Sequence, residues 1–229
     1  MQKERRDFFK STASLGVGLL AFTPGVSAWA KEEKEKNVTA VEDLMREHGA
    51  LNRILLIYDE VSLRLDKKKE FDPEQLKKSA SIIQNFIQGY HEKLEEDFVF
   101  PRLMRANQLT DLVPILKSQH EAGRTLTSSI LSYSNTKSLK NNDERDKLKT
   151  ALQAFVKMYR AHEAREDTVL FPAFKNVVGE KEYHQLGENF EERERQLFGK
   201  NGFENIVGRI EEVEKDLGIF DLKQYSPRL

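Results

Sequence analysis

The sequence predicts an all-α protein, an up-down-up-down four-helix bundle with additional helices at its carboxyl end. Apolar residues recur at steps of three and four through four long stretches, which is the spacing of an amphipathic helix. No alternating run of β-branched residues indicates a sheet. A histidine followed four residues later by a glutamate occurs twice, about seventy residues apart, as His91 with Glu95 and as His162 with Glu166. This repeat indicates a duplicated helical hairpin.

The first thirty residues differ in character from the rest of the chain. Arg5 and Arg6 are followed by an apolar run from Leu15 to Phe22, which precedes an A-x-A sequence at residues 28–30. This order is typical of a cleavable export signal, since the run is too short for a membrane span. The paired arginines resemble the twin-arginine export motif, which implies transport of the folded protein. We therefore expect a periplasmic or otherwise exported protein with no stable membrane insertion after cleavage.

The composition excludes several classes of function. The chain has 37 basic and 38 acidic residues, so no basic field is available to attract nucleic acid. It has no cysteine, which excludes disulfides, thiolate zinc sites, cysteine nucleophiles and cysteine-ligated iron–sulfur clusters.

The first bundle helix is expected after a charged linker at residues 31–38. Thr39 and Glu42 have the spacing of a capping box, in which both side chains bind free N–H groups at a helix start. An inward stripe follows at steps of three and four, formed by Val41, Leu44, His48, Leu51, Leu55 and Tyr58. His48 therefore occupies a core position.

The second and third helices each carry a histidine on the inward face. Asp72 and Pro73 are typical of a helix start, and Pro101 is expected to kink or end the second helix. Its inward side is formed by Ile83, Ile87, His91, Glu95 and Phe98. The third helix is expected to open at Thr110 and Asp111, with inward candidates Leu112, Leu116, His120, Leu126 and Ile130.

The fourth helix is expected from Asp143, after a polar loop at residues 132–142. Its inward stripe is formed by Leu148, Leu152, Phe155, Tyr159, His162, Glu166 and Val169. Shorter helices from Glu180 onward, broken at residues 199–202, are expected to cap the bundle. The chain thus divides into a signal (1–30), a linker (31–38), the bundle (39–176) and a helical extension (177–229).

Buried imidazoles and carboxylates would be costly without partners, by several kcal/mol for each carboxylate. A pair of metal ions removes this cost, and mixed nitrogen and oxygen ligation without sulfur favours iron or manganese. The alternative is a structural network in which Arg165, Lys93 and Arg124 satisfy the glutamates. His184 and Glu188 repeat the spacing once more, but they lie beyond the four-helix pattern and are interpreted as coincidental.

The ordered set of histidines and glutamates resembles the hemerythrin-like family, also called the HHE cation-binding family, over residues 39–176. The resemblance implies a four-helix bundle that holds a non-haem di-iron centre. It implies bridging carboxylates at Glu95 and Glu166 and terminal ligands at His48, His91, His120 and His162.

Two positions matter in the comparison with the oxygen-carrying members of that family. Arg124 stands four residues after His120, where those members have a fifth histidine ligand. Asp167 competes with Glu166, because it has the spacing of the fourth-helix aspartate in those members. The missing ligand could come from a glutamate directly after a histidine, although these are expected to face solvent: Glu92, Glu121 and Glu163.

The functional hypothesis is an exported di-iron protein that binds O2, or a related small ligand such as nitric oxide, for sensing, storage or redox protection. One alternative is an oxidoreductase that oxidises iron or reduces peroxide or nitric oxide at the same centre. The other is a metal-free helical module that docks a partner helix. The sequence leaves open whether the protein is an enzyme, whether the metal is iron or manganese, and the oligomeric state.

Overall fold

The computed structural model of the chain describes residues 38–227. The expected export signal and nearly all of the linker lie outside the described residues. The first bundle helix, α2 (Ala40–Asp66), begins where the capping residues predict, because the Thr39 hydroxyl accepts a hydrogen bond from the Glu42 amide at 3.3 Å.

The second arm of the bundle is helical without interruption from Pro73 to Arg105. Asp72 caps its first turn by accepting a hydrogen bond from the Glu74 amide, as its sequence position predicts. The arm alternates α-helical and π-helical segments: α3 (Pro73–Ile82), η1 (Ile83–His91), α4 (Glu92–Leu94), η2 (Glu95–Val99) and α5 (Phe100–Arg105).

Pro101 does not end this arm. The chain widens into the π-helical turn η2 directly before it, and the Phe100 amide bonds back to the Glu95 carbonyl, five residues earlier. Pro101 then falls in the first turn of α5, where the missing N–H is tolerated. The fourth arm has the same arrangement around Pro172, since the Phe171 amide bonds to the Glu166 carbonyl.

The third and fourth arms complete the bundle. The third arm is α6 (Leu112–Tyr133), and the fourth consists of α8 (Asn142–Arg165), η3 (Glu166–Leu170) and α9 (Phe171–Val177). The polar segment between them is not a simple loop as expected, because it contains the short helix α7 (Thr136–Lys140). Asn135 starts α7 by accepting a hydrogen bond from the Ser138 amide.

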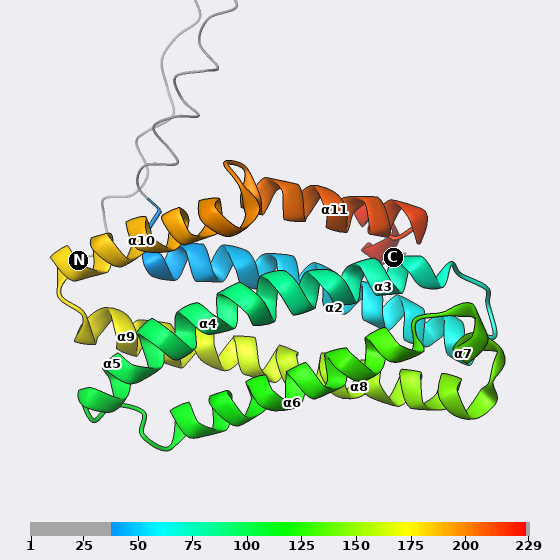
Figure 1. Cartoon of the computed structure of the whole chain (residues 1–229), viewed down its shortest axis with the longest axis horizontal. Helices are drawn as coiled ribbons and strands as arrows, with labels where there is room; N and C mark the ends of the chain where they lie inside the picture. Colours follow the sequence, from blue (N-terminus) through cyan, green and yellow to red (C-terminus); the bar gives the residue numbers. More distant parts are fainter. Residues whose placement is uncertain (1–37, 228–229) are drawn as a thin grey trace, which may run out of the picture. The chain divides into compact units, whose positions relative to one another are not determined.

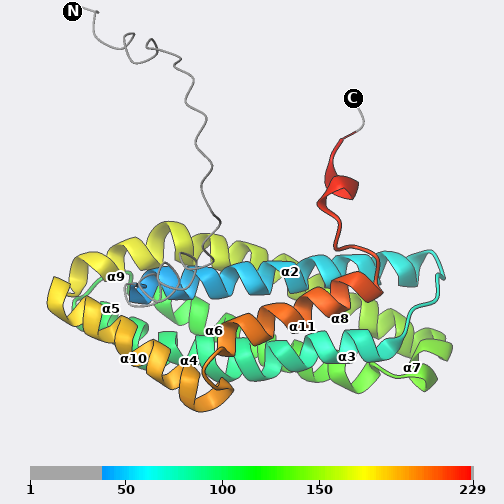
Figure 2. The ribbon, with the colours of Figure 1, turned by 90° about the horizontal axis from the view of Figure 1, so that it is seen from above.

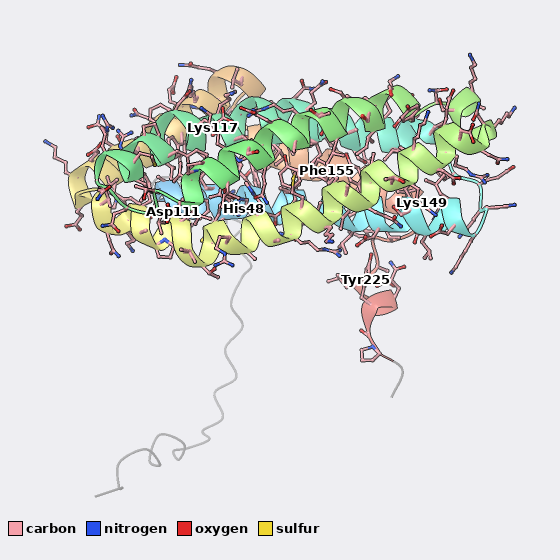
Figure 3. All side chains as sticks on the ribbon, turned by 90° about the horizontal axis from the view of Figure 1, so that it is seen from below. His48, Asp111, Lys117, Lys149, Phe155 and Tyr225 are labelled. Atoms are coloured by element: carbon pink, nitrogen blue, oxygen red, sulfur yellow. The ribbon has the colours of Figure 1, made fainter. Side chains whose placement is uncertain are left out.

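The four arms run alternately in opposite directions, and α8 packs between α2 and α6 (Figure 1). No strand occurs in residues 38–227, so the all-α four-helix bundle is confirmed. His48 and Phe155 lie between the helices, while Lys117 lies on the outside of the bundle (Figure 3). Within the described part of the chain, no helix is long and apolar enough to cross a membrane.

The extension after the bundle consists of α10 (Glu180–Phe198), α11 (Gly202–Asp216) and the 3₁₀ turn η4 (Leu222–Tyr225). Rather than closing one end, α10 contacts α2 and runs obliquely to it, and α11 contacts both α2 and α3 (Figure 2). Gly187 permits the close approach of α10, since a Cβ there would lie 2.8 Å from the Val38 carbonyl oxygen. The extension also contributes to the core through Phe190, Ile210 and Val213, which are fully buried.

Candidate metal centre

Each arm of the bundle contributes one histidine to a single buried cluster. The first half of the bundle (residues 40–105) supplies His48 and His91, called here the first histidine pair, whose Nε2 atoms lie 3.1 Å apart. The second half (residues 112–177) supplies His120 and His162, the second histidine pair, whose Nε2 atoms lie 3.2 Å apart. All four rings are at most 3 % exposed. The four histidines predicted from the sequence therefore meet in one place.

Glu95 and Glu166 are fully buried between the two histidine pairs. Glu95 Oε1 lies 3.8 Å from His91 Nε2, and its Oε2 lies 3.3 Å from His120 Nε2. Glu166 Oε2 lies 3.4 Å from His48 Nε2, and its Oε1 lies 3.1 Å from His162 Nε2. Each carboxylate thus presents one oxygen to each pair, which is the arrangement of a ligand that bridges two ions.

The other nitrogen of each histidine ring contacts a polar side chain. His91 Nδ1 lies 2.6 Å from Glu47 Oε2, and His48 Nδ1 lies 2.8 Å from Asp167 Oδ1. His120 Nδ1 lies 3.1 Å from Glu96 Oε1, and His162 Nδ1 lies 2.9 Å from Gln119 Oε1. Because a carboxylate oxygen only accepts, each Nδ1 that faces one carries the proton. The lone pair of these rings is then on Nε2 and points into the cluster.

These orienting side chains repeat as regularly as the histidines. The residue directly before His48 binds His91, and the residue directly before His120 binds His162. The residue after Glu95 binds His120, and the residue after Glu166 binds His48. Asp167 is therefore the equivalent of Glu96, and it holds His48 from the side that faces away from the cluster. This placement supports Glu166 over Asp167 as the ligand.

The two Phe-Pro sequences serve the same cluster. The Phe100 ring stacks on His120 and the Phe171 ring stacks on His48, each with a centroid separation of 5.5 Å and an interplanar angle of 24°. Each ring crosses from one half of the bundle to the histidine of the other. The stacking fixes the orientation of His48 and His120 and excludes water from one face of each.

The histidine nitrogens and glutamate oxygens of the cluster are arranged to bind a cation rather than to form hydrogen bonds with one another. All four oxygens of Glu95 and Glu166 are buried without a hydrogen bond, although imidazole nitrogens lie 3.1–3.8 Å away. A neutral ring with its proton on Nδ1 has its lone pair on Nε2, so it does not donate to these oxygens. Buried charge without a partner costs several kcal/mol, and a bound cation removes that cost for nitrogens and oxygens together.

The electrostatics of the rings differ within the cluster. Burial lowers the pKa of the His91 imidazole to about 4, so this ring is neutral at pH 7 and ready to act as a ligand. Burial also disfavours the charged form of His120, yet Glu95 and Glu96 raise its pKa to about 10. A proton and a cation therefore compete for His120.

Arg124 stands four residues after His120, at the fifth-histidine position, and it binds carboxylates outside the cluster. Its guanidinium donates to Glu92 Oε2 at 2.8 Å and also to Glu96. Glu92 is 1 % exposed and accepts a further hydrogen bond from the Tyr159 hydroxyl at 2.6 Å. Tyr159 fits there because position 123 is glycine: a Cβ would lie 2.0 Å from the Tyr159 hydroxyl oxygen.

The first half of the bundle contains an equivalent of this contact. Asn52, four residues after His48, donates to the carboxylate of Glu163, which directly follows His162. The expectation that Glu92 and Glu163 face solvent is wrong, because both are buried and held by hydrogen bonds. Glu121 is exposed as expected. His184 and Glu188, the coincidental repeat of the spacing, are exposed and take no part in the cluster.

Sequence reasoning missed the three orienting residues Glu47, Glu96 and Gln119. A signal for them exists in the sequence, since each is directly adjacent to a predicted ligand. The equivalent position in the other half of the repeat also carries a polar residue. Adjacent residues on a helix point about 100° apart, so one is not expected to support the other. The support comes from the neighbouring helix, which sequence spacing within one helix does not reveal.

Comparison with known proteins agrees with this geometry. The family model of the hemerythrin HHE cation binding domain matches residues 39–173. The uncharacterized protein Rv1995 of Mycobacterium tuberculosis and the uncharacterized protein Mb2018 of Mycobacterium bovis are each 45% identical over 195 residues, which cover 85% of this chain and 76% of each relative. No solved structure matches the chain.

Proposed function

Because the chain belongs to the hemerythrin HHE cation-binding family, we propose that it holds two non-haem iron ions and binds O2 or a related small ligand such as nitric oxide. Its buried histidine and glutamate groups make it a metal-binding helical protein. The number of ions, the choice of iron over manganese and the small ligand belong to the proposal.

The observation that carries the proposal is the position of Glu95 and Glu166, each of which directs one oxygen toward the Nε2 atoms of each histidine pair. The first histidine pair would hold one ion and the second pair the other, while Glu95 and Glu166 each give one oxygen to either ion. Each ion would thus receive two nitrogens and two oxygens from the protein. Iron commonly takes more ligands than four, so solvent or a small exogenous ligand would complete the set.

When bound, an iron pair supplies the electrons and the Lewis acidity that O2 or nitric oxide requires. The side chains of this chain then keep the centre dry and fixed. Phe100 and Phe171 cover the rings of His120 and His48, and the orienting carboxylates hold their Nδ1 protons. Sensing, storage and redox protection all require such a protected site.

Export remains part of the proposal. It rests on the paired arginines, the apolar run and the A-x-A sequence of residues 1–30. Cell fractionation followed by amino-terminal sequencing of the mature protein tests it. Mature protein that begins near residue 31 outside the cytoplasm is expected, and a full-length cytoplasmic protein would refute export alone.

The deciding experiment for the centre is metal analysis of protein made in iron-replete cells. About two iron ions per chain are expected, since two histidine pairs each hold one. The double variant His91→Ala/His162→Ala should contain almost none. Less than one iron or manganese per wild-type chain, with no loss in the variant, would refute the proposal and favour a metal-free module.

A second candidate function is redox turnover at the same centre, such as iron oxidation or the reduction of peroxide or nitric oxide. The observation that favours it is that position 124 is an arginine bound to Glu92 and Glu96 instead of a fifth histidine, which would leave a coordination position open for chemistry. Optical spectra of the iron-loaded protein separate the two functions. Bands that appear with O2 and vanish on its removal indicate ligand binding, whereas sustained consumption of peroxide or nitric oxide indicates turnover.

A further inference from the structure

A second group of carboxylates lies behind the first histidine pair, between α2 and α10. Its members are Asp43 and Glu47 of α2 and Glu194 of α10, and one oxygen of each lies within 4.8 Å of one oxygen of the other two. Figure 1 shows α10 beside the amino-terminal part of α2. We propose that these three residues bind a divalent cation of the hard, oxygen-preferring class, such as Ca²⁺, Mg²⁺ or Mn²⁺.

Two oxygens in this group are buried and lack any hydrogen bond. Asp43 is 3 % exposed and Glu47 is fully buried, yet Asp43 Oδ2 and Glu47 Oε1 have no partner. Glu194 is held in position from the other side, because its Oε1 accepts a hydrogen bond from the Phe203 amide at 2.9 Å. A cation among the three would satisfy the buried oxygens, which hydrogen bonds leave unmet.

The charges nearby do not neutralise the group. Arg46 Nη1 approaches Asp43 Oδ1 only to 3.8 Å, and its guanidinium stacks over the Phe203 ring, 4.5 Å from the centroid. The side chain of Arg46 is 41 % exposed, so its charge is largely screened by solvent. Burial, followed by the charges of Glu47 and Glu194, raises the pKa of Asp43 to about 8. Three carboxylates thus share a site that favours added positive charge.

The chemistry of the donors selects the class of cation. The group offers carboxylate oxygens and neither imidazole nor sulfur, whereas the histidine cluster offers four nitrogens. Oxygen-only sites suit Ca²⁺, Mg²⁺ and Mn²⁺, while mixed nitrogen and oxygen sites suit iron. The two sites of this chain would therefore differ in the class of metal that they prefer.

Glu47 connects the two sites. Its Oε2 faces His91 Nδ1 at 2.6 Å, while its Oε1 has no hydrogen bond and is the oxygen that would bind a cation in the carboxylate group. A cation held by Oε1 would draw negative charge away from Oε2 and weaken its hold on the His91 proton. Occupancy of the carboxylate site would then alter the ligand strength of His91 without any change in the shape of the bundle.

Isothermal titration of the purified full chain, with the histidine cluster carrying its own metal, tests the proposal. Ca²⁺ and Mn²⁺ are titrated separately into wild-type protein and into Glu194→Gln and Asp43→Asn, which preserve side-chain size. Wild type should bind one further ion with a Kd of about 10⁻⁴ M or tighter, and loss of one charged ligand should weaken binding at least about tenfold. Glu204→Gln serves as the matched control, because Glu204 is a nearby exposed carboxylate outside the group.

Iron content measured on the same samples separates this proposal from that of the histidine centre. The proposal is supported if Glu194→Gln and Asp43→Asn lose the added ion, keep their iron, and Glu204→Gln behaves as wild type. It is overturned if wild type binds no further Ca²⁺ or Mn²⁺, or if all three variants bind as wild type does. If the wild-type chain contains no iron, the proposal for the histidine centre fails. The titrations with Ca²⁺ and Mn²⁺ still test the carboxylate group.

Discussion

The two histidine pairs are related by the sequence repeat, but their surroundings differ at one decisive position. His91 is oriented by the carboxylate of Glu47, whereas His162 is oriented by the neutral amide of Gln119. A carboxylate behind an imidazole makes the ring a stronger donor to a metal than an amide oxygen does. The first histidine pair therefore has two carboxylates behind it, from Glu47 and Asp167, and the second has only Glu96.

The carboxylates that orient the two histidine pairs also differ in their own surroundings. Burial and Glu194 raise the pKa of the Glu47 carboxyl well above its ordinary value. Burial acts the same way on Glu96, but His120, Arg124 and Lys93 outweigh it and hold the pKa of Glu96 below its usual range. Duplication thus preserved the ligands and let their environments diverge, so we expect two inequivalent metal positions.

The largest expected effect comes from removing a carboxylate that both positions share. Glu95→Ala should reduce bound iron to less than one ion per chain, because Glu95 faces His91 and His120 alike. Glu166→Ala should do the same, since it faces the other two histidines. Iron analysis after purification checks both variants, and full retention of iron in either one would show that the two pairs do not share a bridge.

The next effect tests the inequivalence directly. Glu47→Gln should weaken metal binding at the first histidine pair by about 10- to 100-fold, the usual result of losing an orienting carboxylate. Gln119→Glu is the matched exchange and should strengthen binding at the second pair. Competition with a chelator measures both affinities. Identical chelator curves for the two variants and wild type would mean that Glu47 does not tune its histidine.

A smaller effect concerns the group at the fifth-histidine position. Arg124→Ala should lower the free energy of unfolding by about 2 kcal/mol, because it leaves the buried carboxylate of Glu92 with one donor fewer. Arg165→Ala, an exposed arginine on α8, is the control and should have almost no effect. Chemical denaturation of the metal-free proteins gives both values, and equal stability of the two variants would contradict the prediction.

The last effect is spread over several pH units, and it is a pH dependence specific to the carboxylates behind the first pair. Asp43 has a folded-state pKa of about 8, above its ordinary value of 3.8. Between these values the folded state keeps a proton that the unfolded state has lost. Stability should therefore fall as pH rises from about 4 to about 8, by at most about 1.4 kcal/mol per unit, and level off above.

Asp43→Asn removes that proton from the comparison, so its stability should decline less steeply over the same pH range. Thermal or chemical unfolding in the presence of a chelator measures both curves, since a bound divalent cation would mask the effect. Parallel curves for Asp43→Asn and wild type would show that Asp43 titrates normally in the folded protein.

Much of the fold follows from the sequence because helical periodicity and capping residues are local signals. Thr39 and Asp72 start their helices where predicted, and the inward stripes place all four histidines in the core. The continuation through Pro101 was less predictable, because it depends on a π-helical turn that no single residue type specifies. The short helix α7 arises from a local cap at Asn135 inside an otherwise polar segment.

The metal ligands of the site could be predicted from the sequence, but the side chains that surround and support them could not. Repeat spacing alone brings His48, His91, His120 and His162 to one cluster with Glu95 and Glu166. The burial of Glu92 and Glu163 depends on donors from another helix, Arg124 and Asn52. Such pairings require the distances between helices, which the sequence does not contain.

The crossing of Phe100 and Phe171 between the halves has a consequence for how this bundle could have arisen. The lone histidine at the start of each half is stacked and oriented by side chains of the other half: Phe171 and Asp167 for His48, and Phe100 and Glu96 for His120. A single hairpin would therefore carry an unsupported histidine. An ancestral hairpin of this pattern would complete its site only against an identical second chain, so gene fusion would have joined the two partners of a symmetric dimer.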